Sequence, residues 1–481
     1  MTASPNILFI NTDQQTWDAV SAYGNEHVRT PNIDRLHENG VSFMRSYCTD
    51  PVCAPARASW VSGTYTSENG VPFNGGAMHP DIPDLGQILD RNGYVAARSG
   101  KWHVDGREVR ESFRNLYIGK RQIGACGGEY YDRASTHAAI DFLDRYDEPK
   151  PFFLELGLVN PHDICEYGHN HEHKTIPGPV EQGLLSPGDL PPLPENFDYD
   201  ERETVLQQVM RRGDDPLMLA AIAKGIRDWT PLQWRFMIWN LYRFVEAADQ
   251  QIGLLLNALE QSRFRDDTLI IFSVDHGESH GRHRMFQKFT LYEESVRVPF
   301  IISSLGDRFG LPAGAFDDEH LVSGVDLLPT VLDYAGVGVP DGVQGASLRP
   351  LAEGRDVAWR DFIYIESNYW GRAIVTQRFK YVTEYRPKDE EDFVPPGPAP
   401  NAIGIEQLFD LELDPWETRN LAGDPAHAGD PECAAAITDC RDKLFEFEGR
   451  LRRRPLREGH PRTVVTGWGD HLRAAWAAHD A

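Results

Sequence analysis

Cysteine is scarce in this chain: six occur among 481 residues, and none stands in a CxxC pair or a zinc-site spacing. So few thiols do not build a disulfide scaffold in a chain of this length. Long apolar runs are also missing, since no segment approaches the roughly 20 apolar residues of a membrane span. The first residues carry no basic stretch typical of a signal peptide. These absences predict a cytoplasmic protein that does not enter a membrane.

Positive charge is in short supply as well. The chain has 48 Lys and Arg residues against 73 Asp and Glu residues, a formal net charge of -25. A nucleic acid or an anionic membrane requires a basic surface, so neither is an expected partner. An anionic substrate would have to bind in a local cationic pocket, against the field of the whole protein.

Short apolar runs alternate with helical patterns along most of the chain. Each run is almost wholly apolar and ends in polar residues, as buried strands of a parallel sheet do. This alternation predicts an α/β fold with a mostly parallel sheet. The expected strands are 6–13, 151–162, 267–278 and 296–304, and the expected helices are 30–40 and 231–262.

The length of the chain favours about two domains. A catalytic α/β domain is expected over 1–355, with a Pro-rich insertion at about 175–230. Short, turn-separated β-rich segments follow, and they predict a smaller antiparallel sheet over 356–481 with a helix near 434–451. The last residues, with Trp468 and Trp476, predict a tail helix. Docking of this apolar tail on a neighbour would give a homo-oligomer, a dimer or tetramer; docking on its own subunit is the alternative.

Two of the expected strands end in pairs of potential metal ligands, Asp13-Gln14 and Asp275-His276. Ligands bind at the carboxyl ends of strands in open α/β sheets. Carboxylate and amide oxygens suit Ca²⁺ or Mg²⁺, and one histidine also permits Mn²⁺. Each Asp taken alone could instead cap the following helix. The presence of two such pairs favours a metal site.

Several cationic and titratable side chains follow other strands. Lys101 and His103 would share one face of an extended segment, an arrangement that suits an oxyanion. His162 follows a buried strand, where a proton donor could act. The alternatives are a solvated strand end for the pair and a packed loop histidine for His162.

The segment "HGRHRMFQKF" adds His280, His283 and Lys288, which could meet an anion or form a solvated charged face. A further group of histidines in a loop matches no closed zinc site and is interpreted as a surface cluster. This group is His169, His171 and His173.

The stretch "CTDPVCAPARASWVSGTY" indicates a helix that begins near Cys53. Pro55 would lie in the first turn, where a missing N–H costs little. Residue 53 would then lie at the positive end of the helix dipole, which favours a nucleophile or an oxyanion. Arg57, one turn later, could bind an anion through two nitrogens. The alternative is a buried, inert thiol.

"CAPAR" matches the C-x-P-x-R motif of the type I sulfatases, and the chain resembles that family of the alkaline-phosphatase-like superfamily over most of its length. The resemblance implies a mixed, mostly parallel sheet sandwiched by helices, with a smaller C-terminal α+β domain. It implies hydrolysis of small-molecule sulfate esters. The matching blocks are "PNILFINTDQQ", "TPNIDRLHENGVSF", "CAPARASWVSGTY", "SGKWH", "NPHD", "IFSVDHGE", "YEESVRVPFII" and "LFDLELDPWETRNLA".

The resemblance also implies residue roles. Cys53 would be converted to formylglycine by a formylglycine-generating enzyme, whose hydrate attacks sulfur. Arg57 would stabilise the hydrate, and His103 would take its proton. Lys101 would bridge residue 53 and sulfate. His162 and Lys288 would bind sulfate and assist the leaving oxygen, and Asn74 would contact the transferred group. One divalent cation, Ca²⁺ first and Mn²⁺ or Mg²⁺ as alternatives, would be held by Asp13, Gln14, Asp275, His276 and residue 53.

Two positions depart from the pattern of many sulfatases, which have Asp and Asn where this chain has Gln14 and His276. The Gln and His combination resembles the branch with phosphonate monoester hydrolases and phosphodiesterases. That branch tends to lack the pair seen here as Lys101 and His103. Because neutral Gln lowers the negative charge at the metal, phosphonate or phosphodiester hydrolysis is the alternative activity. An aryl, sugar or choline leaving group remains open.

Overall fold

The computed structural model describes residues 4–104, 106–117, 127–169, 176–198, 203, 207, 226, 228–367, 371–383, 406–427 and 429–454. Its largest unit is an eight-stranded sheet in the order β5-β4-β6-β1-β7-β8-β2-β9. β1 pairs in parallel with β6 and β7, whereas β8 runs antiparallel to β7 and β2. The expected mixed, mostly parallel sheet is therefore confirmed. The strands are β1 (Asn6–Asp13), β2 (Gly40–Phe43), β4 (Val95–Gly100), β5 (Arg114–Tyr117), β6 (Phe152–Pro161), β7 (Thr268–Val274), β8 (Phe300–Ser304) and β9 (Ala315–Asp317).

The central strand is buried on both faces. Leu8 and Ile10 belong to one hydrophobic cluster, whereas Ile7 and Phe9 belong to a second one. Successive side chains of a strand point to opposite faces, so these clusters lie on the two sides of the sheet. This explains the continuous apolar sequence of β1, since a strand with a solvent-exposed face would alternate.

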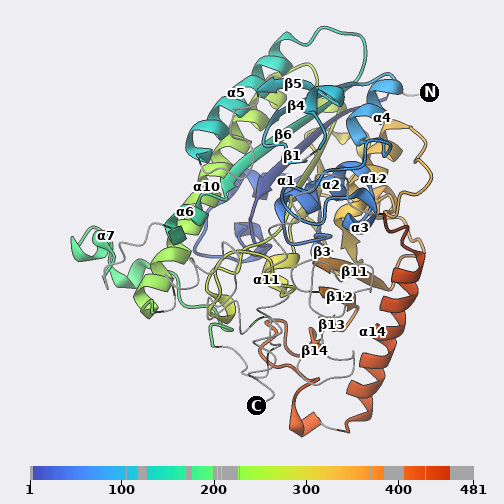
Figure 1. Cartoon of the computed structure of the whole chain (residues 1–481). Helices are drawn as coiled ribbons and strands as arrows, with labels where there is room; N and C mark the ends of the chain where they lie inside the picture. The colour runs from blue at the N-terminus through green and yellow to red at the C-terminus, as the bar shows by residue number, and fades with distance from the viewer. Residues whose placement is uncertain are drawn as a thin grey trace.

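Helices cover both faces of this sheet (Figure 1). α1, α5 and α10 contribute to the first cluster, and α2, α4 and α12 to the second. α10 begins with a capping box in which Thr230 and Gln233 bind each other's backbone. The main helices are α1 (Pro31–Glu38), α2 (Cys53–Ser62), α4 (Leu85–Arg91), α5 (Gly128–Arg145), α10 (Pro231–Gln261) and α12 (Leu327–Ala335). Shorter elements are β3 (Ser46–Tyr47), β10 (Val322–Ser323), α3 (Thr66–Asn69), α6 (Ile164–His169), α7 (Gly178–Glu181), α11 (Glu293–Val296) and α13 (Arg349–Ala352).

A second, antiparallel sheet follows, in the order β11-β12-β13-β14, and α14 packs against it (Figure 1). The predicted C-terminal sheet and helix are confirmed, whereas the domain boundary at 355 stays a prediction. The expected tail helix with Trp468 and Trp476 falls outside the described residues. The elements are β11 (Phe362–Ser367), β12 (Gly371–Thr376), β13 (Phe379–Thr383), β14 (Glu406–Asp410) and α14 (Pro431–Arg450).

Within the described ranges, we find no helix that is both long and apolar enough to cross a membrane.

Candidate active site

The carboxyl ends of β1 and β7 lie side by side, because Thr12 pairs with Val274 in parallel register. The next residue of each strand is an aspartate, and Asp13 and Asp275 are both fully buried. After β1 the chain turns sharply at Gln14, whose φ is +67°. Its backbone N–H donates to the Asp275 carboxylate over 3.1 Å. A positive φ in a residue other than glycine is strained, and such strain gathers at functional sites.

Cys53 is the first residue of α2, as the sequence predicted, and is 1% exposed. Its Sγ lies 3.0 Å from Lys288 Nζ and 3.1 Å from His276 Nε2. Burial is the largest influence on this thiol and raises its pKa. The cations Lys101 and Lys288, with His276, outweigh it and hold the pKa well below the usual value. The surroundings therefore favour negative charge at position 53.

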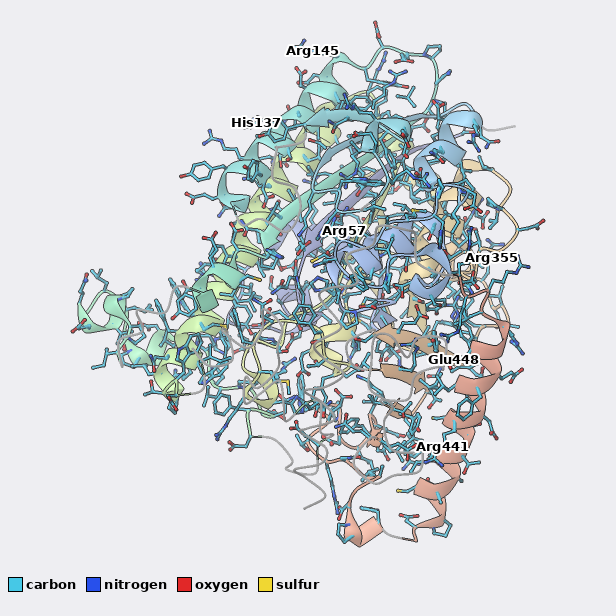
Figure 2. All side chains as sticks on the ribbon, viewed as in Figure 1. Arg57, His137, Arg145, Arg355, Arg441 and Glu448 are labelled. Carbon is cyan, nitrogen blue, oxygen red and sulfur yellow. The ribbon has the colours of Figure 1, made fainter. Side chains whose placement is uncertain are left out.

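Arg57 lies in the interior, whereas Arg145 points outward (Figure 2). The Arg57 guanidinium donates to Asp275 over 2.9 Å, to Asp13 over 3.0 Å and to the side chain of Asn11 over 3.0 Å. The sequence suggested that Arg57 binds an anion near position 53. The structure shows a clamp on the two strand-end carboxylates, and a role of Arg57 at residue 53 stays a prediction.

Two buried lysines approach the thiol from different segments. Lys101 forms an ion pair with Asp13 over 2.6 Å. Lys288 donates to Gln14 Oε1 over 2.7 Å, in addition to its contact with Cys53. They are 1% and 4% exposed. Together they form the local cationic pocket that an anionic substrate requires in so acidic a protein.

His103 and His162 also come together at Cys53, and both interact with its side chain. Burial, with Lys101 and Lys288 nearby, lowers the pKa of His162 to about 4, so its ring is neutral near pH 7. The extended segment expected for Lys101 and His103 does not form. β4 ends at Gly100 and His103 has a φ of +50°.

Ligand atoms of Asp13, Cys53, Asp275 and His276 all lie within 4.8 Å of one another. Two carboxylates and an imidazole at this spacing fit one divalent cation. The Gln14 amide oxygen contacts Lys288, and its amide nitrogen donates to Glu278. The first four residues are the donors of a candidate metal site, and the role of Gln14 as a ligand stays a prediction.

Asn74 lies at the start of α2, where its Oδ1 accepts from the backbone N–H of Ala54 over 3.0 Å. This side chain is exposed. Through its contact with Ala54, Asn74 satisfies a backbone N–H in the first turn of α2, which has no partner within the helix. A contact with a transferred group stays a prediction.

Three further side chains lie at the site that were not predicted from the sequence: Asn11, Cys165 and Glu278. Asn11 stands two residues before Asp13, and Cys165 Sγ lies 3.3 Å from the Gln14 amide nitrogen. The Glu278 carboxylate also accepts from the backbone N–H of Gln287 over 2.6 Å. The position of Glu278 in "VDHGE" is the one signal that could have found it.

The segment that contains Gly277 fits closely against α11. Its N–H donates to the Ser295 carbonyl over 2.9 Å. A Cβ at this position would lie 1.9 Å from the carbonyl oxygen of Glu294. Only glycine therefore fits between the strand-end pair and α11.

Other histidines of the sequence lie elsewhere. His283 contacts Glu294 over 2.9 Å and stacks on Tyr292, and His280 contacts the Glu278 carbonyl over 2.8 Å. His171 and His173 fall outside the described residues, as does the side chain of His169.

Comparison with known proteins gives two family matches. The model of the family "Sulfatase" matches residues 5–337, and the model "N-sulphoglucosamine sulphohydrolase, C-terminal" matches residues 281–432. The chain is 28% identical to an N-acetylglucosamine-6-O-sulfatase of Bacteroides thetaiotaomicron, over 89% of this chain and 84% of the relative.

Solved structures show the same fold. A 2-O GAG sulfatase superposes with a TM-score of 0.74 and 25% identity, covering 94% of this chain and 95% of the other. The phosphonate monoester hydrolase of Agrobacterium radiobacter superposes with a TM-score of 0.69 and 24% identity, covering 93% and 96%. Sulfate and phosphonate ester hydrolases thus share this scaffold.

Proposed function

This chain belongs to the sulfatase family, and we propose that it cleaves sulfate monoesters with residue 53 as the nucleophile. One observation carries the proposal: a side chain at the start of a buried helix lies within 3.1 Å of a lysine and a histidine. A tetrahedral dianion or monoanion is stabilised where preorganised cations surround the attacking atom.

Cys53 is proposed to be converted to formylglycine by a formylglycine-generating enzyme. The residues "CAPAR" and the position at the start of α2 support this. Formylglycine would supply a hydrate oxygen as the nucleophile, and a divalent cation would make that oxygen more acidic.

The residues around position 53 divide the remaining work. Lys101 and Lys288 bind the anionic oxygens of the ester, next to the Asp13 carboxylate and the Gln14 amide that they contact. His103 takes a proton at position 53. His162, neutral near pH 7, donates a hydrogen bond to the leaving oxygen. Arg57 keeps the strand-end carboxylates in place.

The metal is proposed to be Ca²⁺, with Mn²⁺ and Mg²⁺ as alternatives. Asp13, Asp275, His276 and residue 53 would hold it, together with the Gln14 amide oxygen. The buried carboxylates and their spacing support a hard cation. Metal analysis of the purified protein distinguishes the three.

Phosphonate monoester or phosphodiester hydrolysis is the second candidate. Gln14 is neutral where many sulfatases carry Asp, so the site bears less negative charge. A less negative site favours more highly charged phosphoryl transition states. The fold shared with the Agrobacterium enzyme is compatible with this activity.

The decisive experiment compares kcat/KM for a matched aryl sulfate and aryl phosphonate monoester. A higher value for the sulfate is expected, and a large preference for the phosphonate reverses the order of the two candidates. Mass spectrometry of the peptide spanning Cys53 tests the modification. An unmodified thiol in protein from the native host contradicts the proposed nucleophile.

A cytoplasmic location and a dimer or tetramer are further proposals. The five cysteines within the described residues are all free, which is compatible with a reducing compartment. Light scattering on the eluted protein measures the oligomeric state. A monomer would contradict that part of the proposal.

A further inference from the structure

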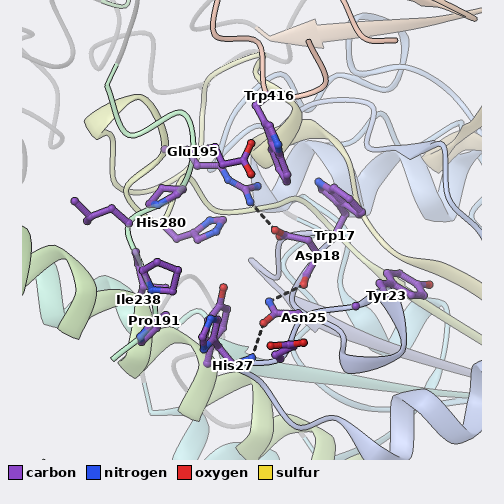
Figure 3. Close-up of a pocket in the computed structure, with 17 residues that line it drawn as sticks. Trp17, Asp18, Tyr23, Asn25, His27, Pro191, Glu195, Ile238, His280 and Trp416 are labelled. Atoms are coloured by element: carbon purple, nitrogen blue, oxygen red, sulfur yellow. Dashed lines mark hydrogen bonds and ion pairs between the residues drawn. The ribbon is translucent and has the colours of Figure 1, made fainter. Parts of the chain in front are cut away.

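A pocket of about 470 Å³ lies beside the candidate active site. Figure 3 shows its walls, which come from the segment after β1, the segment 191–195, α10 and the segment 280–282. Trp416 closes it from the part of the chain that follows the second sheet. Small-molecule sites have this size and occur where structural units meet.

Contacts between its walls hold the pocket in shape. Arg282 forms an ion pair with Asp18 over 2.5 Å, and its guanidinium lies 4.3 Å from the ring centre of Trp416. Trp416 in turn stacks on Trp17, with 6.3 Å between ring centres. The Asn196 amide donates to the Trp416 carbonyl over 2.8 Å. The walls therefore need little reorganisation before a ligand binds.

Glu278 contacts one residue of the candidate active site and one residue of this pocket. Its carboxylate accepts from the Gln14 amide, on the side of Cys53. Its carbonyl contacts His280 Nδ1, and His280 lines the pocket. The two sites are thus neighbours with separate linings.

Several buried donors of the pocket have no partner. Arg282 is 5% exposed, and its Nε and Nη1 have no hydrogen bond within the described part of the chain. The indole N–H of Trp17 is also buried without a hydrogen bond to the described residues. A buried donor without an acceptor destabilises the protein by about 1–3 kcal/mol. These atoms indicate a ligand that offers hydrogen-bond acceptors.

Acceptors are present on the same walls. Glu26 and Glu195 are exposed, line the pocket and make no hydrogen bond or ion pair with the described residues. Since Asp18 neutralises Arg282, these two carboxylates leave the pocket negative. A sulfate, phosphate or carboxylate would be repelled, whereas a hydroxyl can both donate to Glu195 and accept from Arg282.

We propose that this pocket is a second binding site for an uncharged, hydroxyl-rich ring, namely a neutral sugar unit. Indole walls, carboxylate acceptors and guanidinium donors together match the apolar faces and the hydroxyls of such a ring. Its link to catalysis rests on the proposed function, because a sulfated sugar substrate would present such a unit.

The test measures binding to the full-length protein by calorimetry and saturation-transfer NMR. The probes are methyl β-glucoside (neutral), glucosamine (cationic) and glucuronate (anionic). The neutral probe is expected to bind, and the anion to bind at least about tenfold more weakly. Glu195→Lys and Glu26→Lys are each expected to lower the affinity for the neutral probe about tenfold. Glu111→Lys, an exposed carboxylate outside the pocket, is the matched control.

Three results would overturn the proposal: no binding of the neutral probe, glucuronate binding as tightly as the neutral probe, or equal affinity in Glu195→Lys and Glu111→Lys. Trp416→Ala adds a variant that removes an aromatic wall, and its circular dichroism spectrum reports whether it folds. Aryl sulfate hydrolysis by the wild type is measured in parallel. Its absence contradicts the sulfatase proposal and leaves the sugar site standing.

Discussion

Two buried lysines in this protein have opposite surroundings. Lys380, on β13, is 0% exposed and lies 2.9 Å from a Glu417 oxygen and 3.2 Å from a Glu293 oxygen. Lys288 is 4% exposed and donates to the neutral Gln14 amide and to the Cys53 thiol. The first lysine joins the second sheet to α11 with its charge compensated. The second keeps a charge directed at a reactive position.

The difference extends to the rest of each cluster. Glu417 also accepts from the backbone N–H of Glu293 over 2.6 Å, and its carbonyl contacts His283 over 3.2 Å. Around Cys53, by contrast, two lysines meet at one thiol and hold its pKa low. Paired buried charges contribute to structure, whereas a buried group with a strongly shifted pKa marks a candidate functional site. The Lys380 cluster is therefore expected to act on stability and the Cys53 cluster on chemistry.

Replacing a cysteine gives the largest expected contrast. Cys53→Ala should lower kcat for an aryl sulfate by on the order of 10⁴-fold or more, since it removes the proposed nucleophile. Cys48→Ala is the matched control, because Cys48 is equally buried and burial raises its pKa. It should cost some stability and retain activity. Wild-type turnover by Cys53→Ala would refute the scheme.

Removing the metal should have the next largest effect. Dialysis against EDTA is expected to lower kcat at least about 10³-fold and to lower Tm, because buried Asp13 and Asp275 would lose a cation. Adding Ca²⁺, Mn²⁺ or Mg²⁺ in separate samples should restore both quantities to different extents. Full activity in a sample shown by elemental analysis to be metal-free contradicts the prediction.

The same substitution at the two lysines tests the comparison directly. Lys288→Met should reduce kcat/KM about 10²- to 10³-fold with little loss of stability. Lys380→Met should lower the free energy of unfolding by about 3–5 kcal/mol, since Glu293 and Glu417 would face each other without a cation. Its kcat should stay within about threefold of wild type. Urea unfolding measures the stability of each variant, and initial rates measure its activity. Equal losses of stability and of activity in the two variants would contradict the proposed difference between the two lysines.

The smallest expected effect is a pH dependence of stability. Burial raises the pKa of Glu417 to about 7, above its usual value near 4.5. The folded state therefore binds more protons than the unfolded state between these values, so this group stabilises at low pH and loses that contribution as pH rises towards 7. Glu417→Gln should reduce the pH-dependent decline in the free energy of unfolding by about 3 kcal/mol at most. Equal slopes in urea unfolding from pH 5 to 8 would contradict it.

Elements with strong periodicity were predictable from the sequence. β1 spans the predicted residues 6–13, and α10 ends one residue before its predicted end at 262. α2 begins at Cys53, as the cysteine, proline and small residues indicated. Continuous apolar runs and helix start signals are local features, so they can be recognised without knowledge of tertiary contacts. The C-terminal sheet was recognisable for the same reason.

The partners within the site were less predictable. Arg57 binds two carboxylates that are 44 and 218 positions away in the sequence. Its guanidinium direction therefore depends on how β1 and β7 pair. His280 and His283 lie in a segment, continuing to Phe289, in which several residues other than glycine have a positive φ. Such turns in residues other than glycine carry no sequence signal, since tertiary contacts impose them.

Gly277 sets a limit on how this protein can evolve. Its missing Cβ leaves room for the backbone of α11, and a backbone atom cannot rotate away as a side chain can. In a saturation-mutagenesis library, position 277 should tolerate replacement as poorly as the reactive residue itself, although it contributes no functional group. Homologues with different specificities are therefore expected to differ at other positions around the site and to keep glycine at position 277.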